Sequence, residues 1–171
     1  MERRADRLIA TLQLMPHPEG GWFREIHRSQ HMVRPDDGRG PRAALTSIHF
    51  LLAHGQFSRW HRVVSDEIWV HVEGDPLALW TWDAAAPERA PHCSLLGPLG
   101  AAPGLQPQHA VAAGLWQATT TWGGTPQAVG HALAACIVGP GFEFADFRLL
   151  AHEAGTAADL CAAHPASAAW L

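Results

Sequence analysis

Between residues 22 and 150, short segments rich in Val, Ile and Trp alternate with turns that contain glycine or proline. The densest stretch, residues 59–82, is interrupted by Ser65-Asp66 and by Gly74-Asp75-Pro76. Apolar segments of this length between turn residues predict β-strands. The predicted strands are residues 22–28, 44–52, 59–64, 67–82 (broken at 74–76), 92–96, 109–112, 115–122, 128–138 and 144–150. Because many short strands follow one another, we expect an all-β sandwich or barrel.

Two helices are expected outside this β-rich region. Apolar residues recur at helical spacing within residues 4–14, and the Ala-rich tail, residues 156–171, predicts a second short helix that is broken at Pro165. No linker or internal repeat divides the chain. We therefore expect one domain over residues 1–171, with its barrel core at about 22–150.

Composition excludes several classes of protein. Of the 171 residues, 47% are hydrophobic and 16% are charged, which is typical of a globular domain rather than a disordered one. The net charge of -4 comes without a basic stripe, so no nucleic-acid partner is expected. No apolar run is long enough for a membrane span and the N-terminus lacks the apolar stretch of a signal peptide, so we expect a cytoplasmic protein. The 8 Trp and 12 His fit a deep cavity for a small-molecule ligand.

A histidine and a glutamate stand in a regular frame within the densest β segment. Gly55, His61, Glu67 and Gly74 follow the spacing G-x5-H-x5-E-x6-G, and Val63 stands two residues after the histidine. Residues two apart on a strand share a face, so His61 and Val63 are expected to point the same way, and the turn before Glu67 can bring it beside His61. This pattern resembles the first cupin motif, G-x5-H-x-H-x3-E-x6-G, with Val63 in place of the second histidine.

A later segment adds to this resemblance. Residues 111–117 are similar to the second cupin motif, P-x-G-x2-H, with Ala112 in place of the proline and Gln117 in place of the histidine. Nearly the whole chain also resembles one cupin subgroup, the cupin family 5 group of unknown function. This resemblance implies a cupin-type jelly-roll β-barrel with short flanking N- and C-terminal helices. The stretches that carry it are PHPEGGWFRE (16–25), SDEIW (65–69), GDPL (74–77), GLWQ (114–117) and GPGFEFADF (139–147).

His61 and Glu67 are the candidate catalytic residues. A histidine beside a glutamate in a Trp-lined cavity can donate or accept a proton near neutral pH, with Glu67 orienting or charging the ring. More distantly, the chain resembles cupins that epimerise nucleotide-linked sugars without a metal, which implies His61 as the base. If a metal binds, the resemblance implies His61, Glu67 and Gln117 as its ligands, but an amide is a weak third ligand for a catalytic site. No cofactor is firmly implied, and a weakly bound divalent metal is the alternative.

Further residues are expected to line the ligand pocket, each with an alternative role in the core, on the surface or at an interface. An arginine on the first strand suits an anionic ligand group, and large aromatic side chains suit a cavity wall. His17 and Glu19 are assigned to a turn or an interface instead. The ligand-binding candidates are Arg24, Ser47, His49, Trp60, Trp69, Trp116 and Gln117.

Three functions stay open on the sequence. The first is an isomerase- or epimerase-like enzyme acting on a small polar, sugar- or nucleotide-like substrate, and the retained His61 and Glu67 favour it. The second is a non-catalytic binding or sensing module, which the incomplete metal set favours. The third is a metal-dependent cupin oxygenase. Because cupins host many functions, the fold alone cannot choose between them. A homodimer is expected, with Trp22–Arg28 at its interface.

Overall fold

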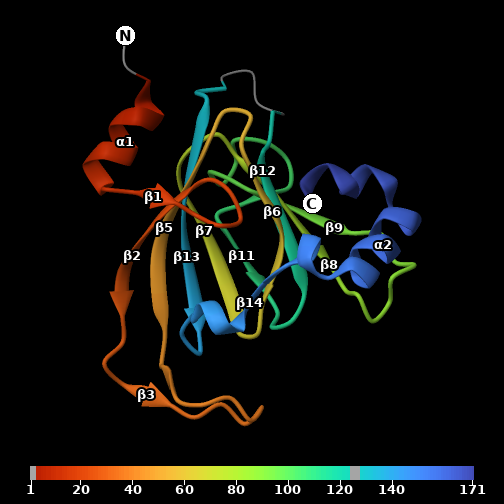
Figure 1. The fold of residues 1–171 in the computed structure, drawn as a ribbon. Helices are drawn as coiled ribbons and strands as arrows, with labels where there is room; N and C mark the ends of the chain where they lie inside the picture. Colours follow the sequence, from red (N-terminus) through yellow and green to blue (C-terminus); the bar gives the residue numbers. More distant parts are fainter. Residues whose placement is uncertain (1–2, 124–127) are drawn as a thin grey trace.

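The computed structural model describes residues 3–123 and 128–171, and two six-stranded sheets form most of it (Figure 1). The first sheet has the order β1-β2-β5-β13-β7-β11, and all its strand pairs are antiparallel. Its strands are β1 (Met15–Pro16), β2 (Trp22–Arg28), β5 (Thr46–Ala53), β13 (His131–Gly139), β7 (Asp66–Gly74) and β11 (Gln108–Val111).

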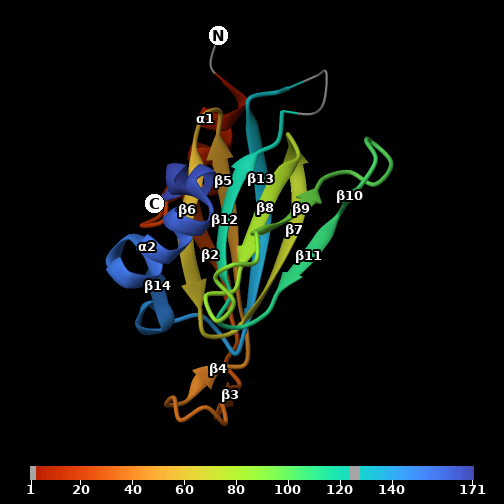
Figure 2. The ribbon, with the colours of Figure 1, turned by 90° about the vertical axis from the view of Figure 1, so that its right-hand side faces the viewer.

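The second sheet has the order β10-β9-β8-β12-β6-β14, and it is antiparallel except for the pair β9–β10. It lies to the right of the first sheet in Figure 1 and faces the viewer in Figure 2. Its strands are β10 (Leu105–Gln106), β9 (His92–Leu96), β8 (Leu77–Trp82), β12 (Trp116–Thr121), β6 (Phe57–Val63) and β14 (Phe147–Leu149).

The main core lies between the two sheets. On β5, Phe50 and Leu52 point inward and pack with Leu79 of β8 and Val111 of β11. These inward side chains alternate with outward ones because successive residues of a strand face opposite sides. The two sheets form a β shell around the cavity described below.

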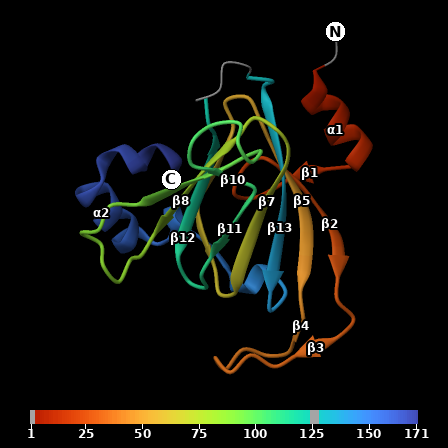
Figure 3. The same cartoon turned by 180° about the vertical axis from the view of Figure 1, so that it is seen from behind.

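Helices cover the outer faces of the shell on two opposite sides (Figures 1 and 3). Helix α1 (Arg4–Leu12) packs Leu8 against Leu51 of β5 and Leu133 of β13. On the other side, α2 (Ala154–Ala163) and the 3-10 helix η3 (Pro165–Trp170) cover Trp60 of β6 and Trp116 of β12. None of the helices in the described residues is both long and apolar enough to span a membrane.

A two-stranded arm, β3 (Met32–Val33) with β4 (Arg42–Ala43), projects from one end of the shell (Figure 1). Asp146 ties the arm to the shell because its carboxylate accepts hydrogen bonds from Arg42 at 2.8 and 2.9 Å and from Arg39 at 3.0 Å. Asp146 lies in the 3-10 helix η1 (Phe144–Asp146), where we expected a strand to begin. The strand β14 starts only at Phe147, and a 3-10 turn, η2 (Leu150–His152), follows it.

The predicted fold class is confirmed. The strand at Trp22–Arg28 has the predicted bounds, and the tail helix ends before Pro165, as expected of a residue that cannot donate a backbone hydrogen bond. The N-terminal helix stops at Leu12, earlier than predicted, because Gln13 adopts a left-handed conformation with φ of 53°.

Candidate functional site

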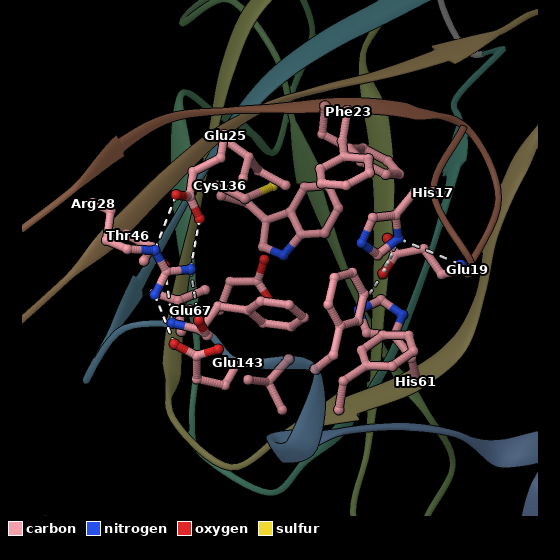
Figure 4. A pocket seen from close by; sticks show the side chains of 18 residues that line it. His17, Glu19, Phe23, Glu25, Arg28, Thr46, His61, Glu67, Cys136 and Glu143 are labelled. Carbon is pink, nitrogen blue, oxygen red and sulfur yellow. Dashed lines mark hydrogen bonds and ion pairs between the residues drawn. The ribbon is translucent and has the colours of Figure 1, made fainter. Parts of the chain in front are cut away.

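A cavity lies between the two sheets and opens on one side (Figure 4). Its empty space measures about 660 Å³, including the part open to solvent. A histidine–glutamate group stands at its inner end, and an arginine held between two glutamates stands at its mouth. Aromatic rings form the walls between them: Phe23, Phe50, Trp69, Phe142, Phe144 and Phe147.

The loop between β1 and β2 places Glu19 inside the shell. Its tight course is held by hydrogen bonds from Gly20 N to the carbonyl oxygen of His17 at 3.0 Å and from His17 N to the carbonyl oxygen of Gly21 at 3.1 Å. Gly20 has φ of +112°, and a Cβ atom there would collide with the carbonyl oxygen of Phe57 on β6. Only glycine satisfies both conditions, so this loop can pass against β6 and direct Glu19 into the cavity.

Glu19 and His61 form the central pair of the site. The Oε2 atom of Glu19 lies 3.3 Å from Nε2 of His61 and 3.2 Å from Nδ1 of His17. Its other oxygen, Oε1, accepts a hydrogen bond from the hydroxyl of Ser58 at 2.9 Å. One buried carboxylate therefore has polar contacts on both oxygens and faces two imidazole rings.

The backbone of β6 orients the His61 ring. Nδ1 of His61 lies 2.8 Å from the carbonyl oxygen of Arg59, which can only accept, so Nδ1 carries the proton in that bond. Nε2 is then the nitrogen that can gain or lose a proton beside Glu19. His61 is only 2% exposed, so this exchange takes place in a site shielded from bulk water.

Burial and the neighbouring imidazoles shift the pKa of Glu19 in opposite directions. Burial by itself would raise its pKa, but attraction to His61 and His17 and the hydrogen bonds from His17 and Ser58 outweigh that cost. The pKa of Glu19 therefore lies below its usual range, and its carboxylate stays ionised.

Glu67, on β7, is the second buried carboxyl group that lines the cavity. Its Oε2 accepts a hydrogen bond from Nε2 of Gln117 at 2.5 Å, and Oε1 of Gln117 accepts one from Nε1 of Trp69 at 3.0 Å. Burial raises the pKa of Glu67; the nearby Glu19 carboxylate raises it further, although His61 and Gln117 partly oppose this. Burial also raises the pKa of the neighbouring Cys136 thiol, which therefore remains protonated and is a poor nucleophile.

Arg28 crosses the mouth of the cavity between two glutamates (Figure 4). Its guanidinium lies 2.7 Å from Glu25 and 2.8 Å from Glu143. Glu25 and Arg28 are three positions apart, so on a regular strand they would face opposite sides. A register shift in β2 between Glu25 and His27 brings both to the cavity.

The structure brings part of the sequence-predicted site together. His61, Glu67 and Trp69 line the cavity, and Gln117 lies buried behind it as the bridge between Trp69 and Glu67. His61 and Glu67 thus share one enclosed space, although the carboxylate that directly pairs with His61 is Glu19.

The other predicted ligand-binding residues are not among those that line this cavity. The Arg24 guanidinium donates instead to the carbonyl oxygen of Leu12 at 3.2 Å and to the side chain of Gln13 at 2.6 Å. On β5, the residues that line the cavity are Thr46, Ile48 and Phe50, so the intervening side chains face outward. The predicted residues placed outside the cavity are therefore Arg24, Ser47, His49, Trp60 and Trp116.

Two residues that we assigned to a turn or an interface, His17 and Glu19, are part of the site. The available signal was the glycine pair after Glu19, because two successive glycines let a loop run close beneath a strand. Because successive residues of a strand face opposite sides, Trp60 could also have been predicted on the face opposite to that of His61, and Trp116 on the face opposite to that of Gln117.

The expected metal ligands are engaged with other groups. Nε2 of His61 faces Glu19, and both ends of the Gln117 amide are hydrogen-bonded. Val63, in place of the second motif histidine, contributes an apolar wall. Within residues 3–123 and 128–171, no group of three or more His, Cys, Asp or Glu is arranged to hold a metal ion. This donor set does not fit a catalytic metal, which takes three protein ligands.

Comparisons with known proteins agree with this architecture. The family model described as Cupin superfamily (DUF985) matches residues 6–150. A protein from Shewanella oneidensis with a known crystal structure is 34% identical, with a TM-score of 0.77 over 99% of this chain and 94% of that one. A hypothetical protein from Leishmania major is 31% identical, with a TM-score of 0.81 over 98% and 96% of the two chains. None of the curated proteins matches this chain.

More distant similarity extends only to the fold. Oxalate decarboxylase from Bacillus subtilis is 13% identical, with a TM-score of 0.53 over 79% of this chain and 29% of that one. A fold shared at this identity does not carry the reaction with it. The family match and the two relatives above 30% identity, by contrast, each span most of the chain. This chain therefore belongs to family 5 of the cupin superfamily (DUF985).

Proposed function

We propose that this cupin binds a small polar molecule in its cavity and isomerises or epimerises it by proton transfer without a metal. The observation that carries the proposal is the contact of 3.3 Å between Nε2 of His61 and Oε2 of Glu19 inside the aromatic-walled cavity. An imidazole held at Nδ1 and facing a carboxylate at Nε2 can take up a proton, because the carboxylate stabilises the imidazolium that forms.

The two carboxyl groups have different roles in this proposal. Glu19, whose pKa is lowered, is ionised and stabilises the charge on His61, whereas Glu67, whose pKa burial raises, is the more easily protonated of the two and acts as the acid. Groups whose pKa values are pushed apart within one site are typical of paired acid and base catalysts.

The proton transfer has a simple balance. In this proposal the substrate C–H group displaces the Glu19 contact at Nε2 of His61. Nε2 then removes a proton from a carbon next to a carbonyl group, and the C–H electron pair moves into an enolate. The carboxylic acid of Glu67 donates a hydrogen bond to the enolate oxygen, and return of the proton to carbon gives the isomer or epimer.

Solvent exchange tests this proposal even while the product is unidentified. The protein is incubated in D₂O with neutral sugars, nucleotide-linked sugars, amino sugars and amino acids, and proton NMR monitors loss of C–H signals. We expect deuterium incorporation in one class of compound, reduced about 10²- to 10⁴-fold in His61→Asn because the base is lost.

His49→Asn is the matched control, because His49 is another histidine of the shell that does not line the cavity. It should leave the exchange rate unchanged. Full exchange in His61→Asn would refute the proposal, and a ligand that binds but returns without exchange would favour the binding module.

A further inference from the structure

The cavity carries more negative than positive groups. Four carboxyl groups line it, those of Glu19, Glu25, Glu67 and Glu143, and among the described lining residues Arg28 supplies the one guanidinium. At the mouth, the carboxylates of Glu25 and Glu143 face the single guanidinium of Arg28, so this end carries an excess of negative charge. This excess repels an anionic ligand at the entrance to the cavity.

Arg28 has little capacity left for a phosphate or a carboxylate. Its Nε and Nη2 atoms donate to Glu25 at 3.0 and 2.7 Å, and Nη2 also donates to the carbonyl oxygen of Phe142 at 3.1 Å. Nη1 donates to Glu143 at 2.8 Å. A guanidinium has five N–H donors, so these bonds leave at most one for a ligand. An anion would have to break the ion pairs at the mouth in order to bind.

Aromatic rings occupy the walls between the two charged ends. Phe142, Phe144 and Phe147 pack against one another at steep angles, with ring centroids 5.1 to 6.3 Å apart. The ring of Phe147 also stacks on that of His61, with their centroids 5.5 Å apart. Aromatic faces carry negative quadrupole charge and attract cations, including quaternary ammonium groups.

We propose that the cavity selects a small organic cation, an amine or a quaternary ammonium compound, rather than a phosphorylated or nucleotide-linked sugar. The cationic group lies against the phenylalanine walls between the carboxylates at the two ends. This inference deepens the proposed function and rests on the same cavity being the functional site, but it does not require that proton transfer takes place there.

Isothermal titration calorimetry with a matched pair of probes tests the charge preference. Choline and its uncharged isostere 3,3-dimethylbutan-1-ol have nearly the same shape, and UDP-glucose is the anionic comparison. We expect choline to bind about 3- to 30-fold more tightly than the isostere, as desolvated cation–π contacts allow, and UDP-glucose to give no measurable heat. Equal affinity for the isostere, absence of choline binding at millimolar concentration, or tighter binding of UDP-glucose would each overturn the inference.

Substitution at the mouth localises the effect. Glu143→Gln removes one carboxylate and releases one N–H of Arg28, so choline affinity should fall and UDP-glucose binding should become detectable. Glu88→Gln, in an exposed loop outside the cavity, is the matched control and should change neither affinity. If choline binds but no compound exchanges deuterium, proton transfer is refuted and the cation preference stands. If a nucleotide-linked sugar exchanges deuterium and choline does not bind, the cation preference is refuted and proton transfer stands.

Discussion

The two faces of strands β6 and β12 have opposite chemistry. On the outer face, Trp60 and Trp116 are fully buried beneath α2 and η3. On the inner face, the adjacent residues His61 and Gln117 are equally buried, but they serve the polar site. Neighbouring residues of one strand thus belong to an apolar cluster and to a network of charged and polar groups.

This difference shows how the fold separates stability from chemistry. Burial of large aromatic side chains contributes stability roughly in proportion to the apolar area removed from water. Burial of Glu19, His61 and Glu67 costs free energy that only mutual hydrogen bonding and charge pairing offset. We infer that the outer tryptophan cluster holds the shell closed, and that the shell in turn keeps the polar residues of the cavity in contact.

Loss of the outer cluster should have the largest effect on stability. Trp60→Ala removes a fully buried ring and the hydrogen bond of 3.0 Å from its Nε1 to the carbonyl oxygen of Ser167. We expect the free energy of unfolding to fall by about 3–5 kcal/mol, measured by urea denaturation. Trp22→Ala, at a half-buried tryptophan of β2, should cost less. Equal losses in the two variants would contradict the role given to the cluster.

A smaller effect is expected in the loop between β1 and β2, which carries Glu19 into the cavity. Gly20→Ala forces a side chain into φ of +112° and against the carbonyl oxygen of Phe57. We expect a loss of roughly 1–3 kcal/mol in the free energy of unfolding and reduced turnover, because Glu19 is displaced from His61. The control is Gly38→Ala, at φ of +84° in the exposed arm with nothing near the added Cβ atom. If the control costs as much, contact with β6 is not what matters at Gly20.

The smallest expected effect is a difference in how the two buried carboxyl groups change the stability of the fold with pH. The lowered pKa of Glu19 means that its ionised form stabilises the folded protein above the unfolded pKa, and this stabilisation is lost as the pH falls. The raised pKa of Glu67 means the reverse, since stability present at low pH is lost as the pH rises through the folded-state pKa.

Urea denaturation of the natural protein and of the variants Glu19→Gln and Glu67→Gln between pH 4 and 8 measures this contrast. Relative to the natural chain, Glu19→Gln should become less stable with rising pH and Glu67→Gln more stable. Parallel pH profiles would show that the two carboxyl groups share one environment, contrary to the contacts described above.

Much of the fold could be predicted because strand signals are local. The alternation of apolar residues and turns predicted the strand at Trp22–Arg28 with its observed bounds and most strands of the shell to within a few residues. The same local pattern could not predict the bulge in β2, which brings Arg28 to the cavity, because a register shift depends on the partner strand.

Only the part of the candidate site that lies within the first cupin motif could be predicted from the sequence. His61 and Glu67 lie six residues apart in one segment, so their spacing indicated a shared space, and both line the cavity. Glu19 lies far from them along the chain, and no local pattern links it to His61. Trp60 and Trp116 illustrate the opposite case, since strand alternation alone would have assigned them to the outer face.

The sequence by itself determined the β-rich shell, the cupin frame and the presence of His61 and Glu67 in it, since these follow from residue types at short, regular spacings. Only the tertiary structure decided that Glu19 pairs with His61, that Gln117 is engaged by Glu67 and Trp69, and that Arg28 is neutralised at the mouth. The physical reason is that these contacts join segments distant in the chain, so they form only when the two sheets close and force buried polar groups to find one another.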